Sequence, residues 1–560
     1  MIDKQPTTLI SDFSALDRAR MCYQPRLPKV LQEGDLHLET REAPSPAQDT
    51  EAIAKDFPLS INKPLVHLAQ GTANLTTEAI TVGVVFSGGQ APGGHNVISG
   101  LLDALLAANP GSHLLGFLGG PIGVVNNEFI ELTSELVNTY RNTGGFDMIG
   151  SGRDKIEKSV DLAACVDTLK NNNCRALVVI GGDDSNTNAA VMAEYFLSQQ
   201  AGIQVIGVPK TIDGDMKNEY IETSFGFDTA AKVYSELVGS ICRDSASARK
   251  YWHFVRLMGR AASHVTLEVG LQVQPSLTII SEEAEQKGWT LAQVTEQIAT
   301  VVARRAAVGK NYGVVVIPEG LLEFLADVKA MISELGALLG KEEAHVKTLK
   351  RHSDRIDYFR KMLSAEAADT YAFLPNSIQD TLLKRDKHGN IPLSQVETEA
   401  LLMDLVDATL KTWKAEGKFD GSFNPLGHFF GYEGRCVQPT NFDSNYCYAL
   451  GYTATQLVRG GATGYTVSAQ NLGAPPEEWE MGGVPVTSML NIEMRKGKPK
   501  PVIKKALVDL DGAPFRFFAA RRDSWVEADA FLFPGPIQYF GPSEVCDAMT
   551  KTLELESGAK

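Results

Sequence analysis

The stretch Arg175–Ser185, RALVVIGGDDS, joins a short apolar run to a turn with two glycines and two adjacent carboxylates. A continuous run of β-branched and aliphatic residues is typical of a strand that is covered on both faces of a parallel sheet. Two further runs show the same pattern, TVGVVF at Thr81–Phe86 before SGGQAPGGHN, and QVIGV at Gln204–Val208 before PKTIDGD. Because each run leads into a helical pattern, the sequence predicts an α/β fold whose ligand site lies at the carboxyl ends of the strands.

Similar patterns recur further along the chain, which is too long for one ordinary core. Phe254–Leu257 leads into Met-Gly-Arg, and Tyr312–Ile317 leads into Pro-Glu-Gly. We therefore expect two Rossmann-like three-layer (αβα) domains with mostly parallel sheets. The predicted layout is an N-terminal extension over 1–75, a first domain over 76–224 plus about 437–500, a second domain over 225–436 with a helical insertion at about 321–425, and a C-terminal segment over 501–560.

Composition excludes several classes of protein. A formal net charge of −15 argues against a general nucleic-acid binder, which needs clustered Lys and Arg. No stretch reaches the roughly 18 apolar residues that span a bilayer, and the N-terminus lacks the pattern of a signal peptide. The seven cysteines are scattered and form no C-x-x-C pair, which indicates free thiols in a reducing compartment. We expect a cytoplasmic protein without nucleic-acid or membrane partners.

The loop Gly181–Ser185 indicates a cation site. Two adjacent carboxylates repel each other at a strand end and favour a cation or a basic partner. Asp183 is suited to hold Mg²⁺ directly or through water. The alternative is helix N-capping by Asp184 or Ser185, which explains one acid but not two.

The loop Pro209–Asp215 carries the other groups that phosphoryl transfer needs. Lys210 can neutralise a phosphate, and Thr211 can donate a hydrogen bond. Asp213 can accept the proton of an attacking sugar hydroxyl, whereas Asp215 shapes the loop or the metal's outer shell. Taken alone, an acidic turn containing glycine is the simpler interpretation. Together, the two loops predict Mg²⁺-dependent phosphoryl transfer.

Four further motifs fit anionic ligands. The glycines of Ser87–Asn96 follow a strand and open a helix, so their backbone N–H groups can face an anion, although tight-turn glycines explain them equally well. Downstream, arginines, acids and an aromatic residue suit a sugar phosphate. These downstream motifs are Met258-Gly259-Arg260, Pro318-Glu319-Gly320 and Tyr432-Glu433-Gly434-Arg435.

The order of these motifs resembles that of the phosphofructokinase family, from about residue 80 to about residue 445 and less sharply in the tail. The similar segments are the GGD loop, the T-I-D loop, MGR and PE. Asp184 and Lys210 stand where ATP-using members usually carry glycine, and in this the chain resembles the long pyrophosphate-dependent class. A carboxylate at position 184 would fill and negatively charge the space of an ATP α-phosphate. Lys210, by contrast, can neutralise diphosphate.

The resemblance implies roles for particular residues. Asp213 is the implied base. Lys210, Asp184 and Arg153 complete the implied catalytic set, with Arg153 coming from a Gly-Ser-Gly-Arg segment. Asp183 is the implied Mg²⁺ ligand. The implied diphosphate-binding residues are Gly88 and Gly89. The implied sugar-phosphate residues are Thr211, Ile212, Asp213, Lys250, Tyr251, Met258, Gly259, Arg260, Glu319, Tyr432, Glu433, Gly434 and Arg435.

The resemblance also implies an assembly and a reaction. Lys250 and Tyr251 fall near the place of a subunit-bridging arginine in ATP-using relatives, so we expect a homodimer with a shared site. The first domain would bind the donor and the second the sugar phosphate. The expected reaction transfers phosphoryl reversibly from pyrophosphate to the 1-hydroxyl of fructose 6-phosphate. The alternatives are an ATP-dependent kinase of the same fold and a non-catalytic regulatory subunit.

Overall fold

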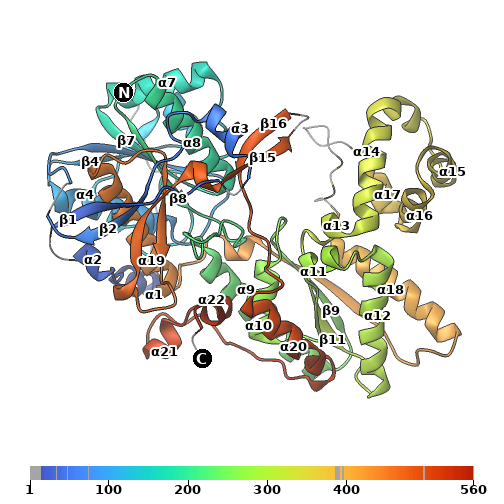
Figure 1. The fold of residues 1–560 in the computed structure, drawn as a ribbon. Coiled ribbons are helices and arrows are strands. Elements are labelled where there is room, and N and C mark those ends of the chain that lie inside the picture. The colour runs from blue at the N-terminus through green and yellow to red at the C-terminus, as the bar shows by residue number, and fades with distance from the viewer. Residues whose placement is uncertain are drawn as a thin grey trace. The chain divides into compact units, whose positions relative to one another are not determined.

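The computed structural model describes residues 14–558 apart from 33–34, 47, 73–74, 385–390, 392, 394–395 and 496–497. The chain forms two compact units, and each unit is assembled from separate segments (Figure 1). Unit 1 contains the described parts of Met1–Ala231, Tyr432–Ala506 and Ile537–Lys560. Unit 2 contains the described parts of Lys232–Gly431 and Leu507–Pro536.

Unit 1 is built on a ten-stranded sheet in the order β1-β2-β14-β13-β8-β7-β3-β4-β5, with β6 beside β3. The neighbours from β13 to β4 run parallel, and the pairs toward both edges are antiparallel. The strands are β1 (Leu36–Arg41), β2 (Leu65–Gln70), β3 (Thr81–Ser87), β4 (His113–Phe117), β5 (Phe129–Glu131), β6 (Ser151–Gly152), β7 (Cys174–Gly181), β8 (Gln204–Pro209), β13 (Tyr465–Gln470) and β14 (Glu480–Pro485). A separate hairpin pairs β15 (Leu490–Arg495) with β16 (Lys498–Ile503).

Helices cover both faces of this sheet (Figure 1). Leu177 and Val179 of β7 pack in one apolar cluster with Leu169 and Phe196 from the helices α7 and α8. Val178 points to the opposite face and is equally buried, as alternation along a strand requires. The helices of unit 1 are α1 (Ala15–Met21), α2 (Lys29–Gln32), α3 (Thr50–Asp56), α4 (Gly94–Ala108), α5 (Pro121–Val125), α6 (Ser134–Asn138), α7 (Ser159–Asn171), α8 (Asp183–Ser198), α19 (Asn441–Arg459), α21 (Ser543–Cys546) and α22 (Lys551–Glu556), with the short turns η2 (Tyr432–Gly434), η3 (Pro476–Glu478) and η4 (Val486–Met489).

The register of the central strands brings three predicted loops to one edge. Ser87 of β3 lies opposite Gly181 of β7, and Gly181 lies opposite Pro209 of β8. Parallel strands that end in register place the residues that follow them side by side. The glycine-rich, acidic and Pro209–Asp215 loops are therefore neighbours.

Two glycines allow α4 and α19 to cross closely in the same unit. A Cβ on Gly100 would lie 2.2 Å from the Tyr448 carbonyl oxygen, and one on Gly451 would lie 2.0 Å from the Val97 carbonyl oxygen. Either contact is far inside van der Waals distance, so neither position accepts a side chain without separating the helices. This crossing holds α19, and with it the segment that precedes α19, on unit 1.

Unit 2 contains a four-stranded parallel sheet in the order β10-β11-β9-β12. Its strands are β9 (Trp252–Leu257), β10 (Leu277–Thr278), β11 (Gly313–Pro318) and β12 (Pro425–Phe430). Its helices are α9 (Phe227–Ala248), which begins within unit 1, α10 (His264–Val273), α11 (Ser281–Gln286), α12 (Leu291–Ala307), α13 (Leu321–Phe324), α14 (Ala326–Val346), α15 (His352–Met362), α16 (Ala365–Phe373), α17 (Asn376–Leu382), α18 (Thr398–Ala415) and α20 (Ala513–Ala528).

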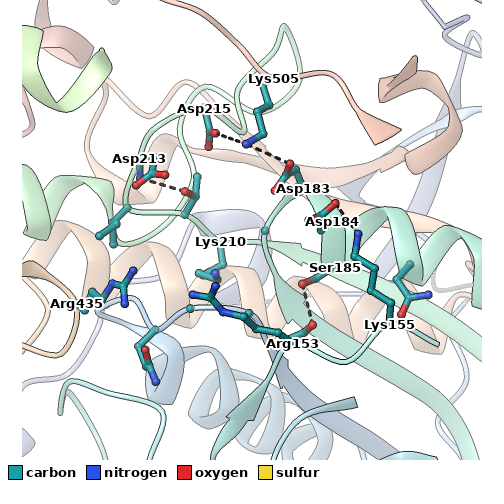
Figure 2. Close-up of a pocket in the computed structure, with 18 of the residues that line it drawn as sticks. Arg153, Lys155, Asp183, Asp184, Ser185, Lys210, Asp213, Asp215, Arg435 and Lys505 are labelled. Atoms are coloured by element: carbon teal, nitrogen blue, oxygen red, sulfur yellow. Dashed lines mark hydrogen bonds and ion pairs between the residues drawn. The ribbon is translucent and has the colours of Figure 1, made fainter. Parts of the chain in front are cut away.

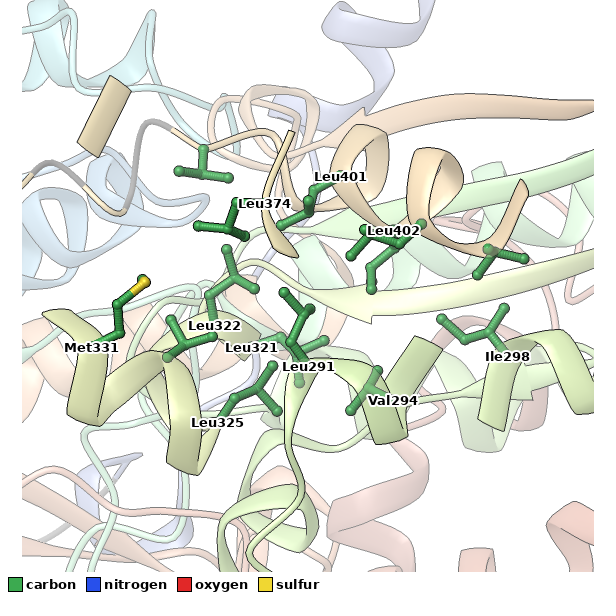
Figure 3. Packing of buried hydrophobic residues seen from close by; sticks show 14 of the residues in the cluster. Leu291, Val294, Ile298, Leu321, Leu322, Leu325, Met331, Leu374, Leu401 and Leu402 are labelled. Carbon is green, nitrogen blue, oxygen red and sulfur yellow. The ribbon is translucent and has the colours of Figure 1, made fainter. Parts of the chain in front are cut away.

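The helices between β11 and β12 share the core of unit 2. Leu291 and Ile298 of α12 pack in one cluster with Leu321 of α13, Leu374 and Leu402 (Figure 3). Burial of such side chains contributes roughly 1.5–3 kcal/mol each. The predicted helical insertion is therefore bound to the body of the unit by a continuous apolar core.

The predicted α/β class with mostly parallel sheets is confirmed, but the boundaries differ in three places. The segment 1–75, predicted as an N-terminal extension, supplies β1 and β2, and His67 of β2 pairs with Gly482 of β14. Its strands are only partly buried and are separated by polar, Pro-containing loops, so the apolar pattern of a buried strand is absent. Among the described residues, no helix is long and apolar enough to cross a membrane.

The other two differences concern the junctions. Tyr432–Arg435, expected in the second domain, belongs to unit 1, because α19 follows at once and packs on α4. The segment 501–560 is divided, with 507–536 in unit 2 and the described remainder in unit 1. Phe518 and Trp525 of α20 are buried in unit 2, and this burial fixes the division.

Candidate active site

A cavity of about 280 Å³ lies in unit 1 where β3, β7 and β8 end (Figure 2). Its wall is dominated by charged and glycine residues from separate segments of the chain. The lining residues are Ser87, Gly88, Gly89, Gln90, Arg153, Asp154, Lys155, Gly182, Asp183, Asp184, Ser185, Asn188, Lys210, Thr211, Ile212, Asp213, Asp215, Arg435 and Lys505. A cavity with converging charges of both signs suits a small, highly charged ligand.

Three cationic groups lie close to Gly88 and Gly89 in the loop after β3. Gly88 has a φ of +91°, and a Cβ there would lie 3.5 Å from Lys210 Nζ. A Cβ on Gly89 would lie 3.7 Å from Arg153 Nη2 and 3.9 Å from Arg435 Nη2. Two arginines and a lysine therefore converge on one glycine turn, an arrangement that suits a diphosphate.

The Gly88 backbone is fixed by the segment that carries Arg153. Its N–H donates to the Gly152 carbonyl oxygen at 2.8 Å, and its carbonyl oxygen accepts from Ser151 Oγ at 2.6 Å. Both bonds accompany the pairing of β3 with β6. The loop and the arginine are thus held in a common frame, which limits the reorganisation needed when an anion binds.

Lys210 is a buried cation at the centre of the cavity. Its side chain is buried, and burial lowers the pKa of the ammonium to about 8. Three carboxylates oppose this shift by favouring the charged form: Asp213, Asp183 and Asp215. The Lys210 N–H donates to the Gly181 carbonyl oxygen at 3.0 Å, so the side chain starts from a fixed point. A desolvated lysine beside glycine N–H groups interacts strongly with a phosphate.

Asp183 and Asp184 occupy the first two positions of α8. Gly182 is the N-cap and makes no side-chain cap bond, while Ser185 Oγ donates to Ser87 Oγ at 2.8 Å. The capping alternative is therefore not what the fold uses. Both carboxylates instead face the cavity, and the helix dipole favours their negative charge.

Each of the two acids pairs with a different lysine. Asp184 Oδ1 lies 3.0 Å from Lys155 Nζ, and Asp183 Oδ2 lies 3.5 Å from Lys505 Nζ (Figure 2). The same Lys505 Nζ lies 3.3 Å from Asp215 Oδ2. Burial opposes the charge on Lys505, but Asp183 and Asp215 raise the pKa of its ammonium above the ordinary value. The adjacent carboxylates of Asp183 and Asp184 therefore form ion pairs with two different lysines.

The loop after β8 presents Asp213 to the same cavity. The Asp213 N–H donates to Thr211 Oγ1 at 3.0 Å, and Gly214 takes a φ of +75°. Positive φ at Gly214 lets the chain turn between two acids without a strained side chain. Both Asp213 and Asp215 line the cavity, but Asp215 is buried and pairs with Lys505. This arrangement leaves Asp213 as the acid of the loop best placed to accept a proton.

Asp183 and Asp215 also fit a divalent metal that shares its coordination with a ligand. Both direct a carboxylate oxygen at one cation, the Lys505 ammonium. Among the described residues, no group of three or more His, Cys, Asp or Glu side chains forms a complete metal site. An ion held here would take its other ligands from water and substrate. Mg²⁺ binds in this way, through one or two carboxylates plus phosphate oxygens.

The predicted sugar-phosphate motifs of unit 2 meet at the ends of two neighbouring strands. The Glu319 N–H donates to the Leu257 carbonyl oxygen at 2.9 Å, and the Gly259 N–H donates to Glu319 Oε2 at 3.3 Å. A Cβ on Gly320 would lie 2.0 Å from the Arg260 carbonyl oxygen. MGR after β9 and PEG after β11 thus form one packed turn, which carries the exposed Arg260.

Chain comparison identifies the family. Residues 81–357 match the family model described as phosphofructokinase. A protein from Porphyromonas gingivalis named pyrophosphate--fructose 6-phosphate 1-phosphotransferase is 52% identical over 97% of this chain and 99% of its own.

The chain belongs to the phosphofructokinase family. A protein with the same name from Entamoeba histolytica is 47% identical over 97% of this chain and 99% of its own length. A pyrophosphate-dependent phosphofructokinase from Nitrosospira multiformis superposes with a TM-score of 0.54 at 14% identity, covering 85% of this chain and 97% of that one. This likeness supports the fold. The family assignment made from the GGD, T-I-D, MGR and PE motifs is confirmed.

The structure brings the predicted residues of this phosphofructokinase-family chain together in part. Unit 1 unites Gly88, Gly89, Arg153, Asp183, Asp184, Lys210, Thr211, Ile212, Asp213 and Arg435 around the cavity. Tyr432 is 70% exposed and stacks on Arg435, whose guanidinium carbon is 4.7 Å from the ring centre. Glu433 and Gly434 complete the η2 turn between them but do not line the cavity.

Lys250 and Tyr251 lie apart from the other predicted residues of unit 2. They precede β9, whereas Met258–Arg260 follows it. Six strand residues at about 3.3 Å each place the two groups roughly 20 Å apart. Within one copy of unit 2 these residues therefore do not join the turn formed by MGR and PEG.

Sequence reasoning missed two lysines of the cavity, Lys155 and Lys505. Lys505 ends a run that includes four other lysines between 496 and 505. Nothing in that run distinguishes one lysine from the next. The tertiary structure brings Lys505 to the cavity because the segment before it lies against α8, where the Ile503 N–H donates to Thr187 Oγ1 at 3.0 Å. Lys155 had a weak signal, because it follows the predicted Arg153 by two residues.

Proposed function

We propose that this chain transfers a phosphoryl group reversibly between diphosphate and the 1-hydroxyl of fructose 6-phosphate, giving phosphate and fructose 1,6-bisphosphate. The observation that carries this proposal is that Asp184 and Lys210 line the same cavity. Asp184 places a negative charge where the α-phosphate of ATP would lie, and Lys210 is a buried cation beside the glycine turn. The printed names of relatives about 50% identical to this chain support the same substrates.

In this reaction Asp213 acts as the general base. Its carboxylate accepts the proton of the 1-hydroxyl as that oxygen forms a bond to phosphorus, while the bond from phosphorus to the bridging oxygen of the diphosphate breaks. The released phosphate leaves with the bonding electron pair. A positioned base contributes about 10²–10⁴-fold to such a step. In the reverse direction, the protonated Asp213 returns the proton to the sugar oxygen.

Three cations stabilise the charge that develops on the transferred group. Lys210 lies beside Gly88, and Arg153 and Arg435 lie beside Gly89. Preorganised charges in a partly desolvated site stabilise a transition state more than the same charges in water. Donor release needs no nucleoside to dissociate, so we expect the reaction to run in both directions.

Asp183 would hold Mg²⁺, with Asp215 as its nearest carboxylate neighbour. When bound, Mg²⁺ neutralises negative charge shared by the two phosphoryl groups. The position of Asp183 at the first residue of α8 keeps the carboxylate at the rim of the cavity, where phosphate oxygens arrive.

Asp184 excludes ATP in this proposal. Its carboxylate lines the cavity next to Asp183 and is oriented by Lys155. A nucleoside triphosphate would have to place its α-phosphate against this acid, at a cost of like-charge repulsion and lost solvation. Diphosphate ends before that point and avoids the penalty.

Met258, Gly259, Arg260 and Glu319 of unit 2 bind the sugar phosphate. Lys250 and Tyr251 contribute from a second copy in a homodimer. Their separation of roughly 20 Å from Met258 supports this role, because one copy alone does not unite them. We assign the enzyme to the cytoplasm, in keeping with its seven free cysteines.

A donor assay tests the proposal. Purified chain is mixed with fructose 6-phosphate, Mg²⁺ and either diphosphate or ATP, and fructose 1,6-bisphosphate is measured. We expect kcat/KM with diphosphate to exceed that with ATP by at least about a hundredfold, which corresponds to about 2.8 kcal/mol of activation free energy. Equal turnover of ATP would refute the donor assignment, and turnover of neither donor would favour a non-catalytic subunit.

A further inference from the structure

Lys505 lies where the proposed metal and the proposed donor meet. It follows β16 by two residues, and its side chain lines the cavity with about a third of its surface exposed. Its Nζ lies 3.5 Å from Asp183 Oδ2 and 3.3 Å from Asp215 Oδ2 (Figure 2). One ammonium therefore pairs with two carboxylates, one of them the proposed metal ligand.

The backbone around Lys505 is anchored on both sides. The Ile503 N–H donates to Thr187 Oγ1 of α8 at 3.0 Å, and the Ala506 N–H donates to the Asp215 carbonyl oxygen at 2.8 Å. The Lys504 N–H donates to the Met489 carbonyl oxygen at 3.0 Å. These bonds fix the start of the side chain, while its four-carbon stem still allows the ammonium to move by several ångströms.

The ammonium and a divalent metal compete for the same carboxylate. Mg²⁺ binds oxygen at about 2.0–2.1 Å and carries two charges, so a metal on Asp183 repels an ammonium 3.5 Å from that carboxylate. Diphosphate brings several negative charges into the cavity at the same time. The ammonium then gains more by facing a phosphate oxygen than by staying on Asp183.

We propose that Lys505 is a diphosphate-binding residue that exchanges partners, pairing with Asp183 and Asp215 in the free site and with a phosphate oxygen once metal and diphosphate are bound. This inference rests on the proposed function, which it deepens. It gives Lys505 a role that a purely structural tether would not have. A tether stabilises the fold but does not compete with metal.

The chain offers a matched control for Lys505. Lys504 is the preceding residue of the same segment, its side chain is exposed, and it does not line the cavity. Lys504→Met and Lys505→Met therefore remove the same charge from the chain, one outside the cavity and one inside it. Thermal unfolding of both variants shows whether either change damages the fold.

Two binding measurements on the full chain test the exchange. Mn²⁺ binding without diphosphate is followed by electron paramagnetic resonance, and binding of inorganic diphosphate in the presence of Mg²⁺ is followed by calorimetry. We expect Lys505→Met to bind Mn²⁺ about two- to fivefold more tightly, because a competing ion pair is lost. We expect the same variant to bind diphosphate about ten- to a hundredfold more weakly, because a charged contact is lost. Lys504→Met should match the wild type in both, and Lys505→Arg should recover much of the diphosphate affinity.

The outcomes separate the possible roles. Weaker Mn²⁺ binding by Lys505→Met, with a lower Tm, would show a structural tether and overturn the exchange. Values equal to those of Lys504→Met would also overturn it. Turnover of diphosphate by the wild type is measured in the same preparations. If the wild type binds diphosphate through Lys505 but does not turn it over, the proposed reaction fails while the exchange stands.

Discussion

The cavity of unit 1 and the MGR–PEG turn of unit 2 are both built at the carboxyl ends of parallel strands, but by different means. In unit 1, long charged side chains from separate segments converge and are sorted into ion pairs such as Asp184 with Lys155. In unit 2, the turn is held by backbone hydrogen bonds and by the close approach of Gly320 to Arg260. Ion pairs between side chains therefore position the groups of the first region, whereas hydrogen bonds of the backbone and close packing position those of the second. Substitutions in the two regions should affect different kinetic parameters.

The largest expected effect comes from Asp213→Ser in unit 1. Removal of the base should lower kcat by about 10²–10⁴-fold, while the dissociation constant for fructose 6-phosphate changes little. Steady-state rates and equilibrium binding of the sugar phosphate measure the two quantities. Equal losses of rate and of sugar-phosphate affinity would assign Asp213 to substrate binding.

Asp184→Gly should change the choice of donor. Loss of the carboxylate removes the repulsion of an α-phosphate, so the ratio of kcat/KM for ATP to that for diphosphate should rise by about ten- to a hundredfold. Lys155→Met is the matched control, because it removes the partner of Asp184 but leaves the acid in place. An unchanged ratio in Asp184→Gly would mean that another part of the site excludes ATP.

The pH dependence should show the buried lysine of unit 1. Because the pKa of Lys210 is about 8 in the free site, kcat/KM for diphosphate should fall about tenfold for each pH unit above that value. The stability effect has the opposite sign. The folded chain loses this proton at a lower pH than the unfolded chain does. The free energy of unfolding should therefore increase with pH between about pH 8 and the ordinary lysine pKa of 10.5, so the protein becomes more stable over this range.

Lys210→Arg provides the control for this profile. A guanidinium remains charged across the whole range, so the residual activity of the variant should show no decline near pH 8. A decline that persists unchanged in Lys210→Arg would place the titrating group elsewhere, on the substrate or on another residue.

The smallest expected effect comes from Gly320→Ala in unit 2. The added Cβ would lie 2.0 Å from the Arg260 carbonyl oxygen, so the turn must shift at a cost of about 1–3 kcal/mol. We expect a lower Tm and a severalfold higher KM for fructose 6-phosphate, with a nearly unchanged KM for diphosphate. Gly309→Ala is a contrasting change, since no atom lies within 4 Å of its Cβ position and only its φ of +79° opposes the substitution. A larger effect on the diphosphate KM than on the sugar KM would contradict the division of roles between the regions.

Much of the fold was predictable because buried parallel strands carry a strong local signal. The runs at β3, β7, β8, β9 and β11 are mostly apolar and lead into loops that contain glycine, so their class and order follow from the sequence. The strands β1 and β2 were missed because they are only partly buried, and their place in the sheet depends on the pairing of β2 with β14 far along the chain. Domain boundaries after residue 430 also depended on such long-range contacts.

The sequence by itself determined which loops line the cavity, because motifs such as GGDDS and PKTIDGD hold their charged residues within a few positions of one strand end. It did not determine how the charges in those loops are paired. Lys505 is hundreds of residues from Asp183 in the chain, and Lys155 is one of many exposed lysines, yet each faces one of two adjacent acids. Ion pairing depends on distances of a few ångströms between side chains. Only the tertiary structure, through the return of β16 along α8, sets those distances.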